Sequence, residues 1–205
     1  MTGAKRTVGI LLFEGVELLD FAGPYEVFGA AHAADEEREP LFDVFSAAEQ
    51  AGPLTCRNGL IVQPDHDLTA APRADVLVVP GGRGTRTAID RPQLIEWIAA
   101  AAAEAELTAG VCTGSFLMAK AGLLDGRAAT THWRSIRRMQ ETFSAVEVRE
   151  NTRWVEDGDR ITSAGVSAGI DMAFQVVRRL YGAEAASATA RSIEYDHWPP
   201  PAPSA

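Results

Sequence analysis

Short runs of consecutive apolar residues alternate along the chain with longer segments in which apolar residues recur every three or four positions. The runs predict strands buried on both faces, and the periodic segments predict helices that cover them. Strands are expected at residues 7–13, 41–47, 76–79, 107–111, 127–131 and 146–148. Helices are expected at residues 92–103, 113–121, 133–143, 167–181 and 183–193. A further helix should begin at Pro24, because proline inside a helical pattern favours a break, here near Gly23.

Two turn signals add antiparallel strand pairs to this pattern. They are Asn58-Gly59 within residues 53–64 and Asp157-Gly158 between residues 153–156 and 160–163. Strands that alternate with helices predict an α/β fold. We expect a flavodoxin-like, doubly wound, mostly parallel sheet with helices on both faces and a small β-hairpin addition.

The composition is that of an ordinary globular protein: 205 residues, of which 46% are apolar and 23% charged. We expect one domain over residues 1–198, followed by a flexible, proline-rich tail at 199–205. The formal net charge of −9 argues against a nucleic-acid partner, because phosphate binding needs concentrated lysine and arginine. The nearest basic cluster, Arg134, Arg137 and Arg138, is expected to be the solvated face of a helix.

No apolar run approaches the roughly 18 residues of a membrane span, and residues 8–13 are too short for the core of a signal peptide. We therefore expect a cytoplasmic protein with no membrane partner. The two cysteines, Cys56 and Cys112, should not form a disulfide framework in that compartment, and Cys56 is expected to serve packing. The four histidines show no zinc-ligand spacing, so no metal is expected.

The strongest chemical signal is Cys112, at the junction of a predicted strand and a predicted helix. Gly110 and Gly114 flank it in the pattern Gly-x-nucleophile-x-Gly, which holds a nucleophile on a tight, strained turn above a sheet. The following helix should direct free N–H groups and its positive end towards the sulfur, so we expect a lowered thiol pKa. A buried structural cysteine at an ordinary strand end is the alternative interpretation.

Asp20 lies between apolar residues in the loop region after the first predicted strand. Parallel strands end at one edge of the sheet, so this region and Cys112 should meet there. If Asp20 is buried beside Cys112, desolvation would raise its pKa and make it a candidate proton donor or acceptor. An exposed carboxylate without a chemical role is the alternative, and the neighbouring Glu17 is expected to be solvated.

A glycine-rich loop containing Gly81 and Gly82 follows the strand predicted at 76–79 and should reach the same edge. The amides of Gly82 and Thr113 are candidate donors to a developing oxyanion. Such turns are often only turns, and this one gains interest from its expected proximity to Cys112.

His132 ends the short strand predicted at 127–131 and is a candidate partner for a thiolate. A helix cap or a structural hydrogen bond is an equally good interpretation of this histidine. The candidate apolar groups for a substrate pocket are Phe21, Trp133, Val166 and Ile170.

Together these motifs resemble the ThiJ/PfpI superfamily, which has a class I glutamine amidotransferase-like fold. The resemblance extends from about residue 7 to residue 200. The matching segments are Leu19-Asp20-Phe21-Ala22-Gly23-Pro24, Val79-Pro80-Gly81-Gly82, Val111-Cys112-Thr113-Gly114-Ser115, residues 121–127, Thr130-Thr131-His132-Trp133 and residues 163–171.

Within the superfamily, the chain is most similar to the isocyanide (isonitrile) hydratase branch, which also matches at Glu194-Tyr195-x-x-Trp198. The resemblance implies that Cys112 is the nucleophile and that Asp20 is its acidic partner, where many members have glutamate. It implies that the amides of Gly82 and Thr113 lie around the site, with Gly81 and His132 as supporting residues. It also implies a homodimer whose site lies close to the dimer interface.

The implied activity is hydration of a small isocyanide to an N-substituted formamide through a cysteine thioimidate, with no metal and no organic cofactor. One alternative is a non-catalytic redox- or ligand-sensing protein related to the amidotransferase-like domain of transcription regulators. Another is glyoxalase- or deglycase-like chemistry. Peptidase activity is disfavoured, because the proteases of the superfamily have histidine where this chain has Thr113.

Overall fold

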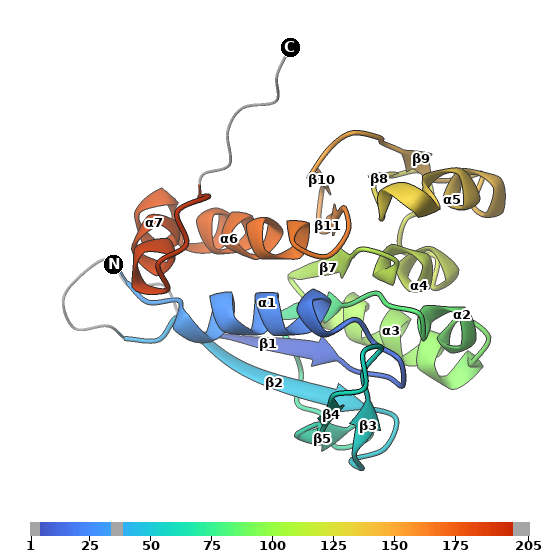
Figure 1. The fold of residues 1–205 in the computed structure, drawn as a ribbon, viewed down its shortest axis with the longest axis horizontal. Coiled ribbons are helices and arrows are strands. Elements are labelled where there is room, and N and C mark those ends of the chain that lie inside the picture. The colour runs from blue at the N-terminus through green and yellow to red at the C-terminus, as the bar shows by residue number, and fades with distance from the viewer. Residues whose placement is uncertain (1–4, 34–38, 199–205) are drawn as a thin grey trace.

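The computed structural model describes residues 5–33 and 39–198. Its centre is a seven-stranded sheet in the order β10-β11-β7-β6-β1-β2-β5 (Figure 1). Neighbouring strands are parallel except β10 and β11, which confirms the mostly parallel sheet expected from the sequence. The strands are β1 (Arg6–Leu11), β2 (Phe42–Ala48), β5 (His66–Asp67), β6 (Val76–Val79), β7 (Leu107–Val111), β10 (Trp154–Asp157) and β11 (Arg160–Ser163).

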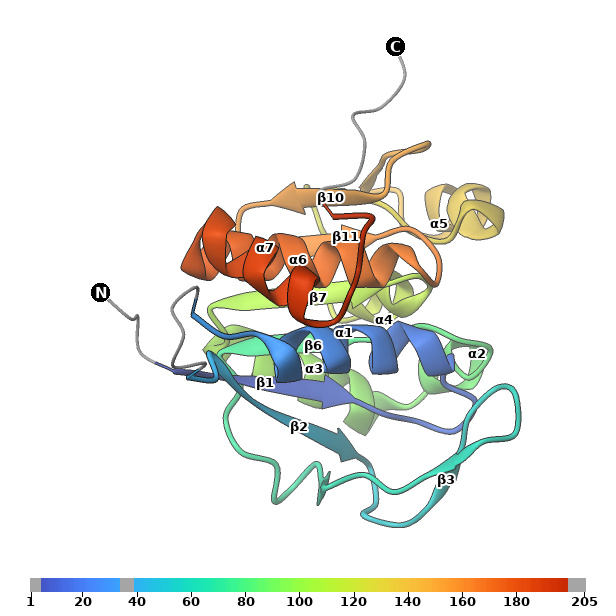
Figure 2. The same ribbon diagram turned by 60° about the vertical axis from the view of Figure 1, so that its left-hand side comes forward.

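Helices cover both faces of the sheet (Figures 1 and 2). One face carries α1 (Leu18–Ala30), α6 (Ala168–Tyr181) and α7 (Ala183–Ser192), which pack against one another. The other face carries α3 (Pro92–Glu104) and α4 (Gly114–Lys120).

Small elements complete the fold and lie mostly around the carboxyl ends of the central strands. The expected hairpin is present as β3 (Leu54–Thr55) and β4 (Ile61–Val62), and the second pair of expected antiparallel strands is β10 and β11. The others are α2 (Thr85–Ala88), β8 (Ala128–Ala129), β9 (Glu147–Val148), a 3-10 turn over Trp133–Ser135 and α5 (Ile136–Thr142). The sequence pattern gave no signal for α2 or β5, because each is too short to show a period.

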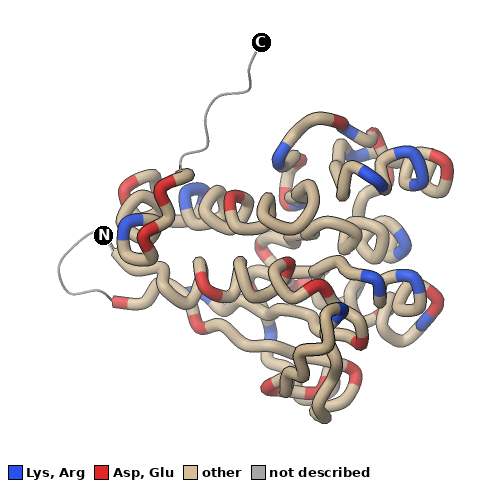
Figure 3. The backbone as a smooth tube through the Cα atoms, in the orientation of Figure 1, with Lys and Arg blue, Asp and Glu red and all other residues tan. Residues whose placement is uncertain are grey.

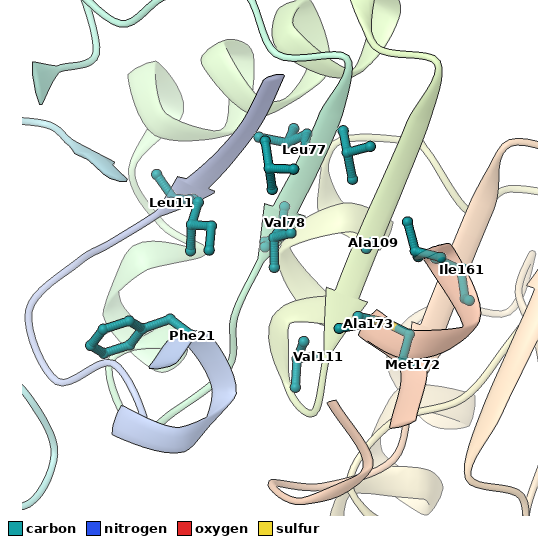
Figure 4. Close-up of a cluster of buried hydrophobic side chains, with 14 of the residues drawn as sticks. Leu11, Phe21, Leu77, Val78, Ala109, Val111, Ile161, Met172 and Ala173 are labelled. Carbon is teal, nitrogen blue, oxygen red and sulfur yellow. The ribbon is translucent and has the colours of Figure 1, made fainter. Parts of the chain in front are cut away.

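The apolar runs of the strands form the core, as expected for a sheet covered on both faces. Figure 4 shows Val111 of β7 and Ile161 of β11 beside Met172 and Ala173 of α6. Gly169 brings α6 close to the sheet, since a Cβ there would lie 2.7 Å from Val111 Cγ1. Burying each large aliphatic side chain contributes about 1.5–3 kcal/mol, so this layer fixes the end of β7 that carries Cys112.

The expected helix break at Gly23 is wrong: α1 begins at Leu18 and continues through Pro24. Proline removes one backbone hydrogen bond from a helix, and burial of Pro24 and Phe28 against the core compensates for the loss. Gly23 lets α6 approach at this point, because a Cβ there would lie 2.7 Å from Ile170 Cγ1. Continuity of α1 has a consequence for the site, since it places Asp20 in the first turn of a helix.

Two sequence expectations concern the periphery of the chain. The tail expected at residues 199–205 lies outside the described residues, and the single domain over 1–198 stays a prediction. In the described part of the chain, no helix has both the length and the apolar character needed to span a membrane.

Candidate active site

Cys112 occupies the tight turn expected between β7 and α4. Its φ of +56° is a conformation that non-glycine residues rarely adopt. The two flanking glycines are required by close approaches. A Cβ on Gly114 would lie 2.0 Å from the carbonyl oxygen of Val79, and a Cβ on Gly110 would lie 2.5 Å from Met118 Sδ. The strained elbow expected from the sequence is therefore present.

Hydrogen bonds hold the backbone of Cys112 in this strained conformation. Its carbonyl oxygen accepts hydrogen bonds from Ser115 Oγ and Thr131 Oγ1, both over 2.9 Å. Its amide donates to the carbonyl oxygen of Ser163 over 3.2 Å. Three separate segments thus over-determine the turn, which is the condition for a strained residue to persist at a functional site.

Asp20 is brought next to Cys112 and is completely buried. Its Oδ2 accepts a hydrogen bond from the amide of Gly81 over 3.0 Å. Its Oδ1 is buried without a hydrogen-bond partner among the described residues. Burial raises the pKa of Asp20 to about 7, although the Gly81 amide opposes the shift. A carboxyl group that titrates near neutrality can both donate and accept protons at physiological pH.

The expectation of a lowered thiol pKa is wrong. Burial raises the pKa of Cys112 to about 12, and the negative charge of Asp20 adds to the effect. The amides of Thr113 and Val166 donate to the sulfur and oppose the shift. They do not overcome it, because desolvation and a neighbouring carboxylate both disfavour a thiolate. Cys112 therefore rests as a neutral thiol beside its acidic neighbour.

Of the two amides expected to donate to an oxyanion, that of Gly82 is engaged within the protein, and the role of the Thr113 amide stays a prediction. The Gly82 amide is already used, because it donates to Thr113 Oγ1 over 3.0 Å. The amides directed at the sulfur are those of Thr113 and Val166. Val166 has a φ of +52°, which is strained for a β-branched residue. The sequence indicated Val166 only as an apolar lining group, since backbone strain leaves no sequence pattern.

Gly81 supports the site through its lack of a side chain. A Cβ at this position would lie 2.6 Å from the amide nitrogen of Thr113 and 2.8 Å from Asp20 Oδ2. Only glycine lets the loop after β6 fit between these two groups. Gly81 thus lies directly against the Asp20 carboxyl, to which its amide donates, and its supporting role stays a prediction.

The expectation that Glu17 is solvated is wrong, because its side chain is buried. Its carboxylate forms an ion pair with Arg57, which belongs to the loop between β3 and β4. The same loop is tied to the segment before α1 by a backbone hydrogen bond of 2.9 Å from the Arg57 amide to the carbonyl oxygen of Val16. The hairpin addition therefore borders the site.

His132 lies at the site but acts as a helix cap. Its Nδ1 accepts a hydrogen bond from the amide of Arg134 over 3.2 Å. The ring packs over Gly165, where a Cβ would lie 2.2 Å from His132 Cδ2. Burial lowers the pKa of His132. Within the described residues no hydrogen bond joins this ring to the sulfur, so the capping interpretation is the one the structure favours.

A pocket of about 330 Å³ opens over Cys112. Besides Cys112, Thr113 and Val166, its walls include Glu17, Arg57, Arg83, Arg86, His132, Arg134 and Arg138. Val166 is the one expected apolar lining group that reaches it. Phe21 is in the core, Ile170 packs at Gly23, and Trp133 is 68% exposed with Arg134 over its ring.

The three residues of the basic cluster are exposed, as expected for a solvated face, and Arg134 and Arg138 also line the pocket, whereas Arg137 pairs with Glu141. Cys56 is buried and serves packing, as expected. In residues 5–33 and 39–198, no group of three or more His, Cys, Asp or Glu side chains is arranged to hold a metal ion.

Other proteins are similar to this chain in sequence. A protein of Pseudomonas putida named isonitrile hydratase is 35% identical over 193 residues, which cover 94% of this chain and 80% of the relative. The transcriptional regulator CdhR of Pseudomonas aeruginosa is 34% identical over 176 residues, covering 86% of this chain. The chain spans about half of that regulator's length, 51%.

Solved structures agree with these sequence matches. The crystal structure of a ThiJ/PfpI family protein from Pseudomonas syringae has a TM-score of 0.85 at 31% identity and covers 97% of this chain and 78% of that one. Drosophila melanogaster DJ-1beta, at 22% identity with a TM-score of 0.79, shares the fold over 93% of this chain and 98% of that one. The sequence profile of the DJ-1/PfpI family matches residues 6–179. The resemblance stated from the motifs is confirmed, and the chain belongs to the DJ-1/PfpI family.

Proposed function

We propose that this protein hydrates an isocyanide to an N-substituted formamide, with Cys112 as nucleophile and Asp20 as the proton carrier. The observation that carries the proposal is the buried pair formed by these two side chains beneath the pocket. The similarity to the Pseudomonas putida isonitrile hydratase supports the same chemistry. The reaction adds water to a carbon atom, and a soft nucleophile with one acid/base group suffices for it.

The first step forms the thioimidate. The thiol is neutral at rest, so its proton has to leave as sulfur attacks the terminal isocyanide carbon. Asp20, with a pKa of about 7, accepts that proton and passes it to the same carbon. A C–S bond and a C–H bond form, the N≡C bond becomes N=C, and Asp20 returns to its carboxylate form.

The second step consumes water and releases the product. Asp20 takes a proton from water while hydroxide adds to the thioimidate carbon, and the nitrogen receives the proton. The hydroxyl proton then leaves as the carbonyl forms, the C–S bond breaks, and the sulfur is reprotonated by way of Asp20. The amides of Thr113 and Val166, which already donate to the sulfur, stabilise the departing thiolate.

The test is absorbance-monitored turnover of phenyl isocyanide by the wild type, Cys112→Ala and Asp20→Asn. We expect formamide from the wild type, none above background from Cys112→Ala, and at least a hundredfold loss in Asp20→Asn, because general acid–base groups contribute about 10²–10⁴. Glu184→Gln, at an exposed position of α7 that does not line the pocket, serves as a control that should retain activity. Full activity in Asp20→Asn would exclude the proton-carrier role.

Ligand sensing without catalysis is a second candidate function, and the match to the regulator CdhR favours it. Absence of formamide in the wild type, together with tight binding of a small ligand, would replace the hydratase proposal by this one. The redox form of the sensor hypothesis is weaker. Oxidation sensors need a thiolate of low pKa, whereas burial and Asp20 raise the pKa of Cys112.

Homodimerisation and a cytoplasmic location stay predictions from the sequence.

A further inference from the structure

The pocket over Cys112 carries an unusual excess of positive charge. Five arginines line it, namely Arg57, Arg83, Arg86, Arg134 and Arg138, and Glu17 is the one carboxylate in its walls. Glu17 is already neutralised by Arg57. Four guanidinium groups are left without a counter-charge in the pocket, in a chain whose formal net charge is −9.

Arginines elsewhere in the described chain differ from those of the pocket in their ion pairing. Outside the pocket, every described arginine except Arg178 and Arg191 forms an ion pair with a carboxylate. Inside the pocket, by contrast, only Arg57 does so. Among the described residues, arginines without a carboxylate partner are therefore concentrated around the pocket over Cys112. Figure 3 shows basic residues on α2 and α5, which come from different parts of the sequence and lie at the same end of the molecule.

Arg86 of α2 and Arg138 of α5 come from different elements and both line this pocket. The pKa of Arg138 is lowered by partial burial and by the charge of Arg86. The guanidinium of Arg138 is held in place over the ring of Phe116, 4.2 Å from the ring centre. Arg138, held by this ring, and Arg86 line one pocket and have no carboxylate partner among the described residues, so they can together bind an anion, because each guanidinium offers a planar fork of donors to carboxylate or phosphate oxygens.

We propose that the pocket selects molecules bearing an anionic oxygen group, a carboxylate or a phosphate, which Arg86 and Arg138 bind while the electrophilic carbon meets Cys112. As a statement about the substrate this rests on the proposed hydratase function, and it then names isocyanides with an acidic substituent. The charge selection itself does not depend on that chemistry. Arg86 and Arg138 act in it as specificity-determining residues.

The test measures the charge preference of Cys112 without any turnover. Iodoacetate and iodoacetamide alkylate the same thiol and differ in charge, so the ratio of their rate constants cancels the reactivity of the thiol. Peptide mass analysis of the full chain distinguishes Cys112 from Cys56. We expect the iodoacetate-to-iodoacetamide ratio to fall about threefold to fivefold in Arg86→Gln and in Arg138→Gln, the effect of one exposed ion pair.

Arg178→Gln is the matched control, because Arg178 is exposed, unpaired with any carboxylate among the described residues, and outside the pocket. Its ratio should equal that of the wild type. In the wild type the ratio should also fall as NaCl rises from 0.02 M to 0.5 M, since salt screens exposed charges. A ratio that neither pocket variant changes would overturn the proposal, even if both variants are folded and active.

Two further measurements identify the anion and the substrate. Protection of Cys112 from iodoacetamide by benzoate or by phenyl phosphate distinguishes a carboxylate site from a phosphate site, and protection by neither would count against the proposal. Turnover of 4-isocyanobenzoate relative to phenyl isocyanide tests the substrate class. If neither isocyanide is hydrated while the alkylation ratio responds to Arg86 and Arg138, the hydratase function fails and the anion site stands.

Discussion

The amide of Gly81 donates a hydrogen bond of 3.0 Å to Asp20 Oδ2 and thereby joins the loop after β6 to the first turn of α1. This contact fixes the carboxyl group whose other oxygen is buried without a partner in the described chain. One amide does not offset complete burial, so the carboxyl keeps a raised pKa. The Asp20 carboxyl group therefore exchanges its proton near pH 7, where an exposed aspartate is already ionised.

Asp20 should reduce stability at neutral and higher pH. Folding raises the pKa of Asp20 from the ordinary value of 3.8 to about 7. The contribution of this shift to the free energy of unfolding is therefore fully present below pH 3.8 and is lost as pH rises through 7. Asp20→Asn cannot ionise and should be more stable than the wild type at pH 8 by roughly 2–4 kcal/mol. Urea denaturation at pH 4.5, 6 and 8 measures this, and the difference should shrink towards low pH. A difference that stays constant over this range would show that Asp20 does not titrate there.

The same substitution should make Cys112 more reactive while it abolishes turnover. The charge of Asp20 raises the thiol pKa, so Asp20→Asn should lower it and accelerate iodoacetamide labelling at pH 8.5 by about threefold to tenfold. Cys56 in the same sample is the internal control, because its raised pKa comes from burial, Glu14 and Glu17. Slower labelling of Cys112 in the variant would mean that Asp20 assists ionisation of the thiol.

Glycine is required at position 114 of α4 but not at position 29 of α1. Gly114→Ala would place a Cβ 2.0 Å from the carbonyl oxygen of Val79 and should destabilise the protein by about 3 kcal/mol or more. Gly29→Ala meets no atom within 4 Å and should stabilise it by about 0.5–1 kcal/mol, the difference in helix propensity. Thermal or urea denaturation of both variants provides the comparison. Equal effects would show that the elbow can relax around a methyl group.

The hairpin should depend on Glu17. Arg57→Gln leaves the buried carboxylate of Glu17 without its partner and should cost about 1–3 kcal/mol in the free energy of unfolding. Arg137→Gln breaks a fully exposed pair with Glu141 and should cost at most about 0.5 kcal/mol. If Glu17→Gln restores the stability of Arg57→Gln, the unpaired charge is the cause. No recovery in the double variant would point instead to lost packing of the Arg57 stem.

The sequence predicts those features that rest on local patterns. Buried strands such as Val76–Val79 show as apolar runs, and turns such as Asn58-Gly59 show through residue types that accept positive φ. The elbow was predictable for the same reason, since Gly110 and Gly114 are the residues that a crowded turn demands. The family resemblance added the partnership of Asp20 with Cys112.

Other features could not be predicted because they depend on what packs around a residue. Pro24 continues α1 because the surrounding core is buried, and proline alone signals a break. Glu17 is buried because a loop forty residues away in sequence supplies Arg57. The direction of the thiol pKa shift depends on desolvation, which a helix N-terminus in the sequence does not reveal.

By itself, then, the sequence determined the alternation of the main strands and helices along the chain, the strained turn at Cys112 and the family. Each of these depends on residue types at neighbouring positions of the chain. Only the tertiary structure decided the protonation of the site and the charge of its pocket. Three features arise from contacts between distant segments: the burial of Asp20 and Cys112, the use of the Gly82 amide by Thr113, and the lining of one pocket by both Arg86 and Arg138. Electrostatic energies follow from distance and solvent access, and folding sets both.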